Sequence, residues 1–168
     1  MAQKYASPCI ASLHVHPAER NQKKAPTKMI AEPHMDLVQG KGIVQDVRYF
    51  DTKNKSSGKA NKNHVSLMTR EEIASFKCDL LPGDVRSNIE LNGSILSGEV
   101  TLADLIHKNV RIGQDAVLHI YKLRTPCWQM DVLQPGLQAS MRHGRQGVIA
   151  EVVHSGRISI GDTISIVE

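Results

Sequence analysis

Hydrophobic and polar residues alternate with a period of two along much of this chain, which is the pattern of half-buried β-strands. In CIASLHVH, residues 9–16, small or aliphatic side chains alternate with Ser12, His14 and His16. This alternation predicts a strand whose two histidines lie on its polar face. Further strands are predicted in GIVQDVRYF (42–50), HVSLMT (64–69), SNIELNG (87–93), VRIGQDAVLHIYKL (110–123) and GVIAEVVHSGRISIGDTISIV (147–167).

Turn and helix signals separate these strands. Thr69 stands three residues before Glu72, a capping box that predicts a short helix through REEIASF. A second brief helix is predicted in PGLQASMRHG, 135–144, because proline favours helix starts and glycine follows helix ends. NG at 92–93 and SG at 155–156 are turn dipeptides, and the second predicts a hairpin between its flanking strands. Many short strands with a few short helices predict a mainly β fold, a closed or partly open β-barrel.

No linker divides the chain, so we expect one domain over residues 1–168, with a core from about 10 to 167. DTKNKSSGKANKN, residues 51–63, has almost no apolar residue and predicts a mobile surface loop. The chain is 40% hydrophobic but only 4% aromatic. Its core is therefore expected to be mostly aliphatic.

The formal charge of +4 favours anionic partners such as phosphates, nucleic acid or an anionic cofactor, without selecting one of them. The three cysteines, Cys9, Cys78 and Cys127, have no zinc-site spacing, which predicts free thiols in a reducing compartment. The N-terminus lacks an apolar run of signal-peptide length, and no run approaches the roughly 18 apolar residues of a membrane span. A cytoplasmic protein that does not enter the membrane is expected.

Cys127 is the candidate reactive residue. Arg124 lies three residues before it, and Pro126 directly precedes it. A nearby positive charge favours the thiolate, the form of cysteine that binds metals or attacks electrophiles. Proline fixes the backbone ahead of the sulfur. The alternative is a structural cysteine, because free cysteine is among the most buried residue types; Cys9 and Cys78 are interpreted in that way.

Three arginines, Arg48, Arg86 and Arg124, stand near the ends of predicted strands. The planar guanidinium suits phosphates and ring-edge acceptors. If these side chains converge on one mouth of a barrel, they form a ligand site. If they do not, each is a solvated surface charge. Both interpretations are open at the level of sequence.

Other candidate sites are weaker. His14 and His16 lack a third partner at a convincing spacing for a metal site. The lysines of NQKKAPTK (21–28) and of residues 51–63 have no interleaved aromatic side chains on which bases stack, which argues against nucleic acid as a partner. A solvated surface explains these lysines better.

Three C-terminal segments resemble successive blocks of the MOSC family, which is named after the C-terminal domain of molybdenum-cofactor sulfurases. They are LLPGDVRSNIELNGSI, VRIGQDAVLHIYKLRTPCWQM and GVIAEVVHSGRISIGDTISI. IASLHVHP, VQDVRYF and HVSLMTREEI also resemble the family's N-terminal strands in the expected order. The resemblance therefore extends from about Ile10 to Val167, and its most specific piece is Arg-x-Pro-Cys at 124–127.

The resemblance implies a barrel of the kind also found in pyruvate kinase, and a module that binds molybdenum cofactor or carries sulfur. In the mitochondrial amidoxime reducing components, the matching cysteine ligates molybdenum. Related bacterial proteins reduce N-hydroxylated bases. By this resemblance Cys127 would be the metal ligand or persulfide carrier, and the catalytic residue of an enzyme. Arg48, Arg86, Asn88 and Arg124 would contact the molybdopterin.

The pyridoxal-phosphate domain of the cofactor sulfurases has no counterpart in this chain. Sulfur would then come from a cysteine desulfurase, and electrons from an electron-transfer partner. Three interpretations follow: a molybdenum-dependent reductase of N-hydroxylated compounds, a non-catalytic persulfide carrier for metal–sulfur assembly, and, ranked last, a basic nucleic-acid-binding module.

Overall fold

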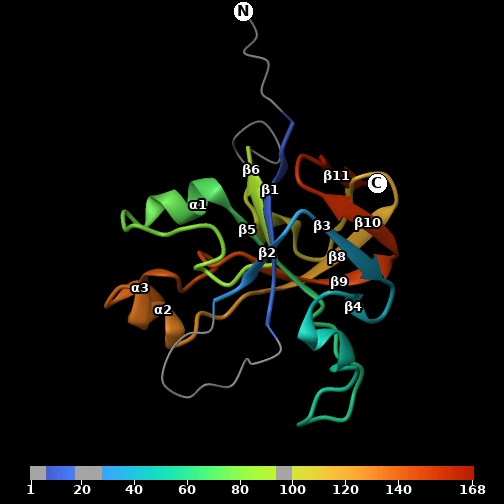
Figure 1. Cartoon of the computed structure of the whole chain (residues 1–168), viewed down its shortest axis with the longest axis horizontal. Coiled ribbons are helices and arrows are strands. Elements are labelled where there is room, and N and C mark those ends of the chain that lie inside the picture. Colours follow the sequence, from blue (N-terminus) through green and yellow to red (C-terminus); the bar gives the residue numbers. More distant parts are fainter. Residues whose placement is uncertain (1–6, 18–27, 94–99) are drawn as a thin grey trace, which may run out of the picture.

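The computed structural model describes residues 7–17, 28–93 and 100–168. Most of its regular structure is β-structure in two sheets (Figure 1). The larger sheet has the strand order β11 (Ile164–Val167), β7 (Asn109–Ile112), β8 (Ala116–Leu123), β9 (Val148–His154), β5 (Val65–Thr69), β6 (Ile89–Asn92), β1 (Cys9–Val15) and β2 (Ile30–Glu32). The smaller sheet has the order β10 (Gly156–Ser159), β3 (His34–Val38) and β4 (Gly42–Ile43).

Short helices connect the strands in the described ranges. The α-helices are α1 (Arg70–Ser75), α2 (Gln129–Leu133) and α3 (Leu137–Ser140). The 3₁₀ helices are η1 (Val47–Phe50) and η2 (Leu102–Leu105). Figure 1 shows α2 and α3 side by side on the same side of the large sheet as α1.

The large sheet curls until its two ends approach each other. The Ile10 N–H donates to the Asp162 carbonyl at 2.9 Å, and the Ile164 N–H donates to the Pro8 carbonyl at 3.1 Å. Cys9 and Thr163 form an isolated antiparallel bridge at the same place. Because the pairing stops at this bridge, the sheet is a partly open barrel, which confirms the predicted mainly β fold class.

The core is aliphatic, as the composition predicts. The side chains of β1, β5, β6, β7, β8 and β9 that face inward form one cluster, and every buried hydrophobic side chain in the described residues is Ile, Leu, Val, Met or Ala. A second, smaller cluster contains Met68, Ile73 and Met141 and lies where α1 and α3 cover the sheet.

Local signals predict several elements correctly. Thr69 caps α1, and its hydroxyl accepts the Glu72 N–H at 3.1 Å. α3 lies within the predicted helical segment 135–144. β7 and β8 form an antiparallel hairpin whose turn needs Gly113, with φ of 66°. In each case the sequence signal lies within a few residues of the element that it predicts.

Residues 42–50 do not form the predicted strand. Only Gly42 and Ile43 pair as β4, and Asp46 then starts η1 by accepting the Arg48 N–H at 2.8 Å. Aspartate readily bonds the backbone two residues on, which competes with strand pairing. Arg48 therefore lies on a 3₁₀ helix and not within a strand.

The hairpin predicted through residues 155–156 is also wrong. β9 pairs with β5 and β8, whereas β10 pairs with β3 in the other sheet. The Ser155 hydroxyl accepts the Gln39 N–H at 2.8 Å, which ties this turn to the smaller sheet. A Cβ on Gly156 would lie 2.6 Å from the Ala116 nitrogen, so a larger residue does not fit this crossing.

His14 on β1 and His16 just after it are buried, although both were expected on a polar strand face. His14 packs against the turn at Gly83, and His16 packs against Asp46. Residues 51–63 are mostly exposed, as expected of a surface loop, although Lys53 and Ala60 form a bridge. Their mobility stays a prediction.

Candidate functional site

Cys127 lies in the turn that joins β8 to α2, and its side chain is exposed. Just after β8, the Arg124 N–H donates to the Gly147 carbonyl at 3.0 Å beside the start of β9. The Cys127 carbonyl accepts the Met130 N–H at 3.1 Å, at the first turn of α2. Pro126 lies between these anchors and has a fixed φ. Backbone contacts on both sides therefore hold the sulfur at the surface.

The Arg124 guanidinium carries a buried donor without a partner. Its Nη2 donates to the Arg86 carbonyl at 2.7 Å, while Nη1 is buried and has no hydrogen bond to any described residue. Burial lowers the pKa of Arg124 to about 10, and the charge of the Cys127 thiolate acts in the opposite direction. The side chain is still cationic at neutral pH. A buried cationic donor without a partner is suited to an anionic ligand.

Arg86 is held in an uncommon backbone conformation. It ends the turn at 82–86 with φ of 59°, in the left-handed region, and its N–H donates to the Gly83 carbonyl at 2.9 Å. Such a residue costs about 1–2 kcal/mol and persists where the surrounding structure fixes it. Burial lowers the pKa of Arg86, the Cys127 charge raises it and the Arg48 charge lowers it. Arg86 is thus within electrostatic range of both.

The structure brings together four of the five residues singled out from the sequence. The pKa of Arg124 depends on its burial first, and then on the charges of Cys127, Arg48 and Arg86. Arg48 also donates from Nη2 to the Asn63 carbonyl at 3.2 Å. Arg86 and Arg124, from the turn at 82–86 and the end of β8, are within electrostatic range of the exposed thiol and of Arg48 on η1. Their roles toward a cofactor stay predictions.

The fifth residue, Asn88, is a buried hydrogen-bonding centre. Its Oδ1 accepts the Ser66 N–H at 3.1 Å and the Ser66 hydroxyl at 3.0 Å. Its Nδ2 donates to the His14 carbonyl at 3.0 Å and to Asp46 Oδ2 at 3.2 Å. These four bonds use the hydrogen-bonding capacity of the carboxamide. Asn88 therefore acts on the site by fixing Asp46, which begins the helix that carries Arg48.

His16 and Asp46 complete this layer, and neither was selected from the sequence. Asp46 Oδ2 accepts the His16 N–H at 2.8 Å and His16 Nδ1–H at 2.9 Å. Burial lowers the pKa of His16, so the imidazole is neutral at pH 7. Burial alone would raise the pKa of Asp46, but the hydrogen bonds from His16 and the Arg48 N–H bring it below its ordinary value. The pair is a carboxylate and a neutral imidazole.

Glu90 fixes the turn that positions Arg86. Its side chain is fully buried, with Oε1 accepting the Gly83 N–H at 2.9 Å. Oε2 accepts from Arg70 Nη1 at 2.8 Å and from the Ser12 hydroxyl at 3.1 Å. A buried carboxylate needs such partners. The alternating pattern of SNIELNG predicts that Glu90 lies on a strand, but it does not predict that Glu90 is buried. Glu90 is buried because both faces of β6 are covered.

A groove runs along the turn on the side of Arg124. The Arg124 groove is lined by Leu123, Arg124, Thr125, Pro126, Gln138, Arg142, His143 and Gly144. Arg142 and His143 are exposed along it.

The described residues contain no cluster of three or more His, Cys, Asp or Glu side chains placed to hold a metal ion. No helix in the described ranges is long and apolar enough to cross a membrane.

The fold is shared with several solved structures. The YuaD protein from Bacillus subtilis superposes with a TM-score of 0.74 at 19% identity, over 96% of each chain. YiiM from Geobacillus stearothermophilus gives 0.68 at 15% identity, over 96% of this chain and 75% of that one. YiiM from Escherichia coli gives 0.60 at 12% identity, over 99% and 71%. At these identities the likeness shows the fold alone.

No curated protein matches the chain. The family model described as the MOSC domain matches residues 54–165. This range covers more than half of the chain and contains Arg86, Asn88 and the turn from Arg124 to Cys127. The chain therefore belongs to the MOSC domain family.

Proposed function

We propose that the protein binds molybdenum cofactor at the turn of Cys127, with the Cys127 thiolate as the protein ligand of the metal. The family match supports a domain like that of the molybdenum-cofactor sulfurases. The observation that carries the proposal is the exposed sulfur of Cys127 within electrostatic range of Arg124, whose buried Nη1 has no partner among the described residues. A thiolate is a soft ligand that suits molybdenum.

The residues around the thiol fit the group. Molybdopterin is an anionic pterin with a phosphate, and guanidiniums bind such groups with two parallel hydrogen bonds. The Arg124 Nη1 donor is free of any described partner, so an anionic oxygen in its reach would satisfy it. In this proposal Cys127 supplies one metal ligand and the cofactor supplies the others. Arg86 and Arg48 add positive charge within electrostatic range of Arg124.

As an enzyme, the protein would reduce N-hydroxylated compounds. The balanced step converts R–NH–OH, two electrons and two protons into R–NH₂ and water. When bound, the cofactor supplies the two-electron oxygen-atom transfer. An electron-transfer partner protein would supply the electrons. The chain's own residues bind the anionic cofactor and orient the substrate against it.

The test is to purify the protein from a host that makes the cofactor and to measure bound molybdenum and pterin. We expect near-stoichiometric metal in the parent, loss of metal in Cys127→Ser, and no loss in Cys78→Ser, which alters a half-buried cysteine elsewhere. Arg124→Met should lower the pterin content by about tenfold or more, since a buried charge-assisted bond is lost. Arg111→Met, at an exposed position of β7, is its control. Equal metal in the parent and in Cys127→Ser would remove Cys127 from the ligand set.

A second function, persulfide transfer, is supported by the exposure of Cys127. The Cys127 thiolate would attack the terminal sulfur of the persulfide on a cysteine desulfurase. The sulfur is transferred to Cys127, and the cysteine of the desulfurase leaves as a thiol. Mass spectrometry after incubation with desulfurase and cysteine distinguishes the two functions. A carrier gains one sulfur atom on Cys127 and binds no molybdenum. Absence of that adduct would exclude the carrier.

A further inference from the structure

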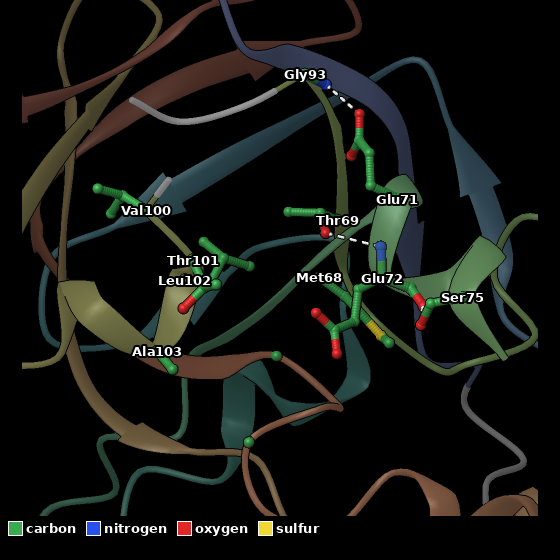
Figure 2. A pocket seen from close by; sticks show the side chains of 12 residues that line it. Met68, Thr69, Glu71, Glu72, Ser75, Gly93, Val100, Thr101, Leu102 and Ala103 are labelled. Carbon is green, nitrogen blue, oxygen red and sulfur yellow. Dashed lines mark hydrogen bonds between the residues drawn. The ribbon is translucent and has the colours of Figure 1, made fainter. Parts of the chain in front are cut away.

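A second hollow lies on the other side of Gly144 from the Arg124 groove. This α1 cavity has a volume of about 410 Å³ and lies between α1 and η2 (Figure 2). It is lined by Met68, Thr69, Glu71, Glu72, Ser75, Gly93, Val100, Thr101, Leu102, Ala103, Gly144 and Gly147. Gly144 lines both hollows, so the two are neighbours separated by one stretch of backbone. The volume is within the range of small-molecule sites.

The walls of the α1 cavity are apolar and fixed. Met68 belongs to the second core cluster, and Leu102 belongs to the main one, so both are held by packing. At Gly147 a Cβ would overlap the Leu67 carbonyl oxygen, so the chain passes close to β5 only because this residue is glycine. These walls suit a hydrocarbon or aromatic group.

Two carboxylates, Glu71 and Glu72, line this largely apolar space, and that of Glu72 is the less well paired. Figure 2 shows the Glu72 carboxylate extending from α1 toward the side of η2. Its backbone N–H is bound by the Thr69 hydroxyl, but its carboxylate accepts no hydrogen bond from the described residues. The nearest cation is Arg145, whose Nε lies 3.8 Å from Glu72 Oε1. The neighbouring Glu71 differs, because its Oε1 accepts the Gly93 N–H at 2.7 Å.

Arg145 is held mainly by other groups. Its Nη1 donates to the Ser140 carbonyl at 3.1 Å, and its Nη2 donates to the Ser75 hydroxyl at 3.1 Å. The guanidinium also stacks over the Phe76 ring at 4.7 Å. Burial raises the pKa of Glu72, and the Arg145 charge only partly opposes this. The carboxylate is thus partly desolvated and incompletely paired.

We propose that the α1 cavity binds a small apolar molecule that carries an amine or amidine cation, with Glu72 as its counter-ion. A cation beside Glu72 forms the charge-assisted hydrogen bonds that the carboxylate lacks. Met68 and Leu102 contact the apolar part of the ligand. Anionic ligands are disfavoured by Glu71 and Glu72. The proposal is independent of the function assigned to Cys127, because no residue from 124 to 127 lines the cavity.

The experiment compares benzamidine with benzamide, its neutral counterpart of nearly the same shape. Binding to the full chain is measured by titration calorimetry and by nuclear magnetic resonance shifts. We expect saturable benzamidine binding that is about tenfold tighter than benzamide binding, the effect of one charge-assisted contact. Glu72→Gln should remove this preference, and Glu71→Gln should keep most of it. Ala103→Leu, which fills the cavity, should weaken both ligands.

Other outcomes would overturn the proposal. These are equal affinity for benzamidine and benzamide, an unchanged preference in Glu72→Gln, or no saturable binding of benzamidine. Circular dichroism shows whether each variant is folded, and Thr69 still caps α1 in Glu72→Gln because that bond uses the backbone N–H. Cys127→Ala should bind benzamidine as the parent does. Failure of molybdenum binding and failure of amidine binding are therefore separate results.

Discussion

The Arg124 groove and the α1 cavity share Gly144 but have opposite chemistry. The groove is lined by the cationic side chains of Arg124 and Arg142, and the exposed Cys127 follows directly after its lining residue Pro126. The α1 cavity has apolar walls and a carboxylate, Glu72, supported by packing. The proposed anion and cation sites lie this close, each held by a different kind of interior.

The largest expected effect is a double separation of ligand binding. Cys127→Ala removes the thiolate on which the proposed metal or persulfide binding depends, so that binding should be lost while benzamidine binding stays at the parent level. Glu72→Gln should do the reverse. Metal analysis and calorimetry on the same purified samples measure both. If either substitution weakened the binding of metal and of benzamidine by similar factors, the two hollows would not be separate sites.

Asn88→Ala tests the polar support of the Cys127 side. The substitution removes four buried hydrogen bonds, including those of the Ser66 N–H and of the His14 carbonyl. We expect a loss of about 3 kcal/mol in the free energy of unfolding, because an unsatisfied buried group costs about 1–3 kcal/mol. Urea denaturation measures it.

The control for this variant is Asn92→Ala, at an exposed position on the same strand, which should change the unfolding free energy by less than about 0.5 kcal/mol. In Asn88→Ala we also expect weaker cofactor binding, since Asp46 Oδ2 loses one of the hydrogen bonds that fix it at the start of η1 and is then held by His16 alone. A folded variant with the stability of the parent would show that the hydrogen bonds of Asn88 contribute little.

The comparison also separates what the sequence could predict from what it could not. The turn that presents Cys127 was found because its information is local: a strand pattern, an arginine and a proline within four residues. Arg48, Arg86 and Arg124 were selected one by one, but their convergence depends on β6, β8 and η1 meeting in space. Such long-range contacts leave no periodic signal in a single chain.

The buried carboxylates show the limit most clearly. In the sequence, Glu90 and Asp46 are ordinary polar positions of predicted strands. Because burial of a charge is normally disfavoured, nothing in this pattern predicts that they are buried. Their burial is possible only because Arg70, His16 and backbone N–H groups come from distant segments. The α1 cavity was missed for the same reason, because the sequence predicted α1 but not what would lie opposite it.

Acid should lower the free energy of unfolding through three buried histidines. Burial lowers the pKa of His14, His16 and His64 below the ordinary value of 6.5. The unfolded chain therefore binds more protons than the folded one below that pH, and the free energy of unfolding falls as the pH drops. Each histidine contributes up to about 1.4 kcal/mol per pH unit until its folded-state pKa is reached. Glu72 has the opposite sign, because its folded-state pKa is raised.

His64→Gln makes this dependence measurable. His64 Nδ1 accepts the Val152 N–H at 3.0 Å, so Nε2 carries the proton of the neutral ring and donates to the Asn61 carbonyl at 2.7 Å. Protonation would break the first bond. Urea denaturation from pH 7 to pH 5 should show a shallower fall in the variant than in the parent. The exposed His154→Gln should keep the parent slope, and equal slopes in all three proteins would refute the assignment.

The smallest expected effect tests whether Arg145 competes with the ligand cation for the Glu72 carboxylate. Arg145 Nε lies 3.8 Å from Glu72 Oε1, which is a weak and partly exposed pair. Such pairs contribute about 0.2–1 kcal/mol, so Arg145→Gln should tighten benzamidine binding by about 1.4- to fivefold and leave benzamide binding unchanged. The gain should shrink at high salt, because exposed charges are screened. Arg142→Gln removes the same charge from the Arg124 groove and should have no effect on benzamidine. Equal gains in the two variants would mean that benzamidine responds to net charge and not to a released Glu72 carboxylate.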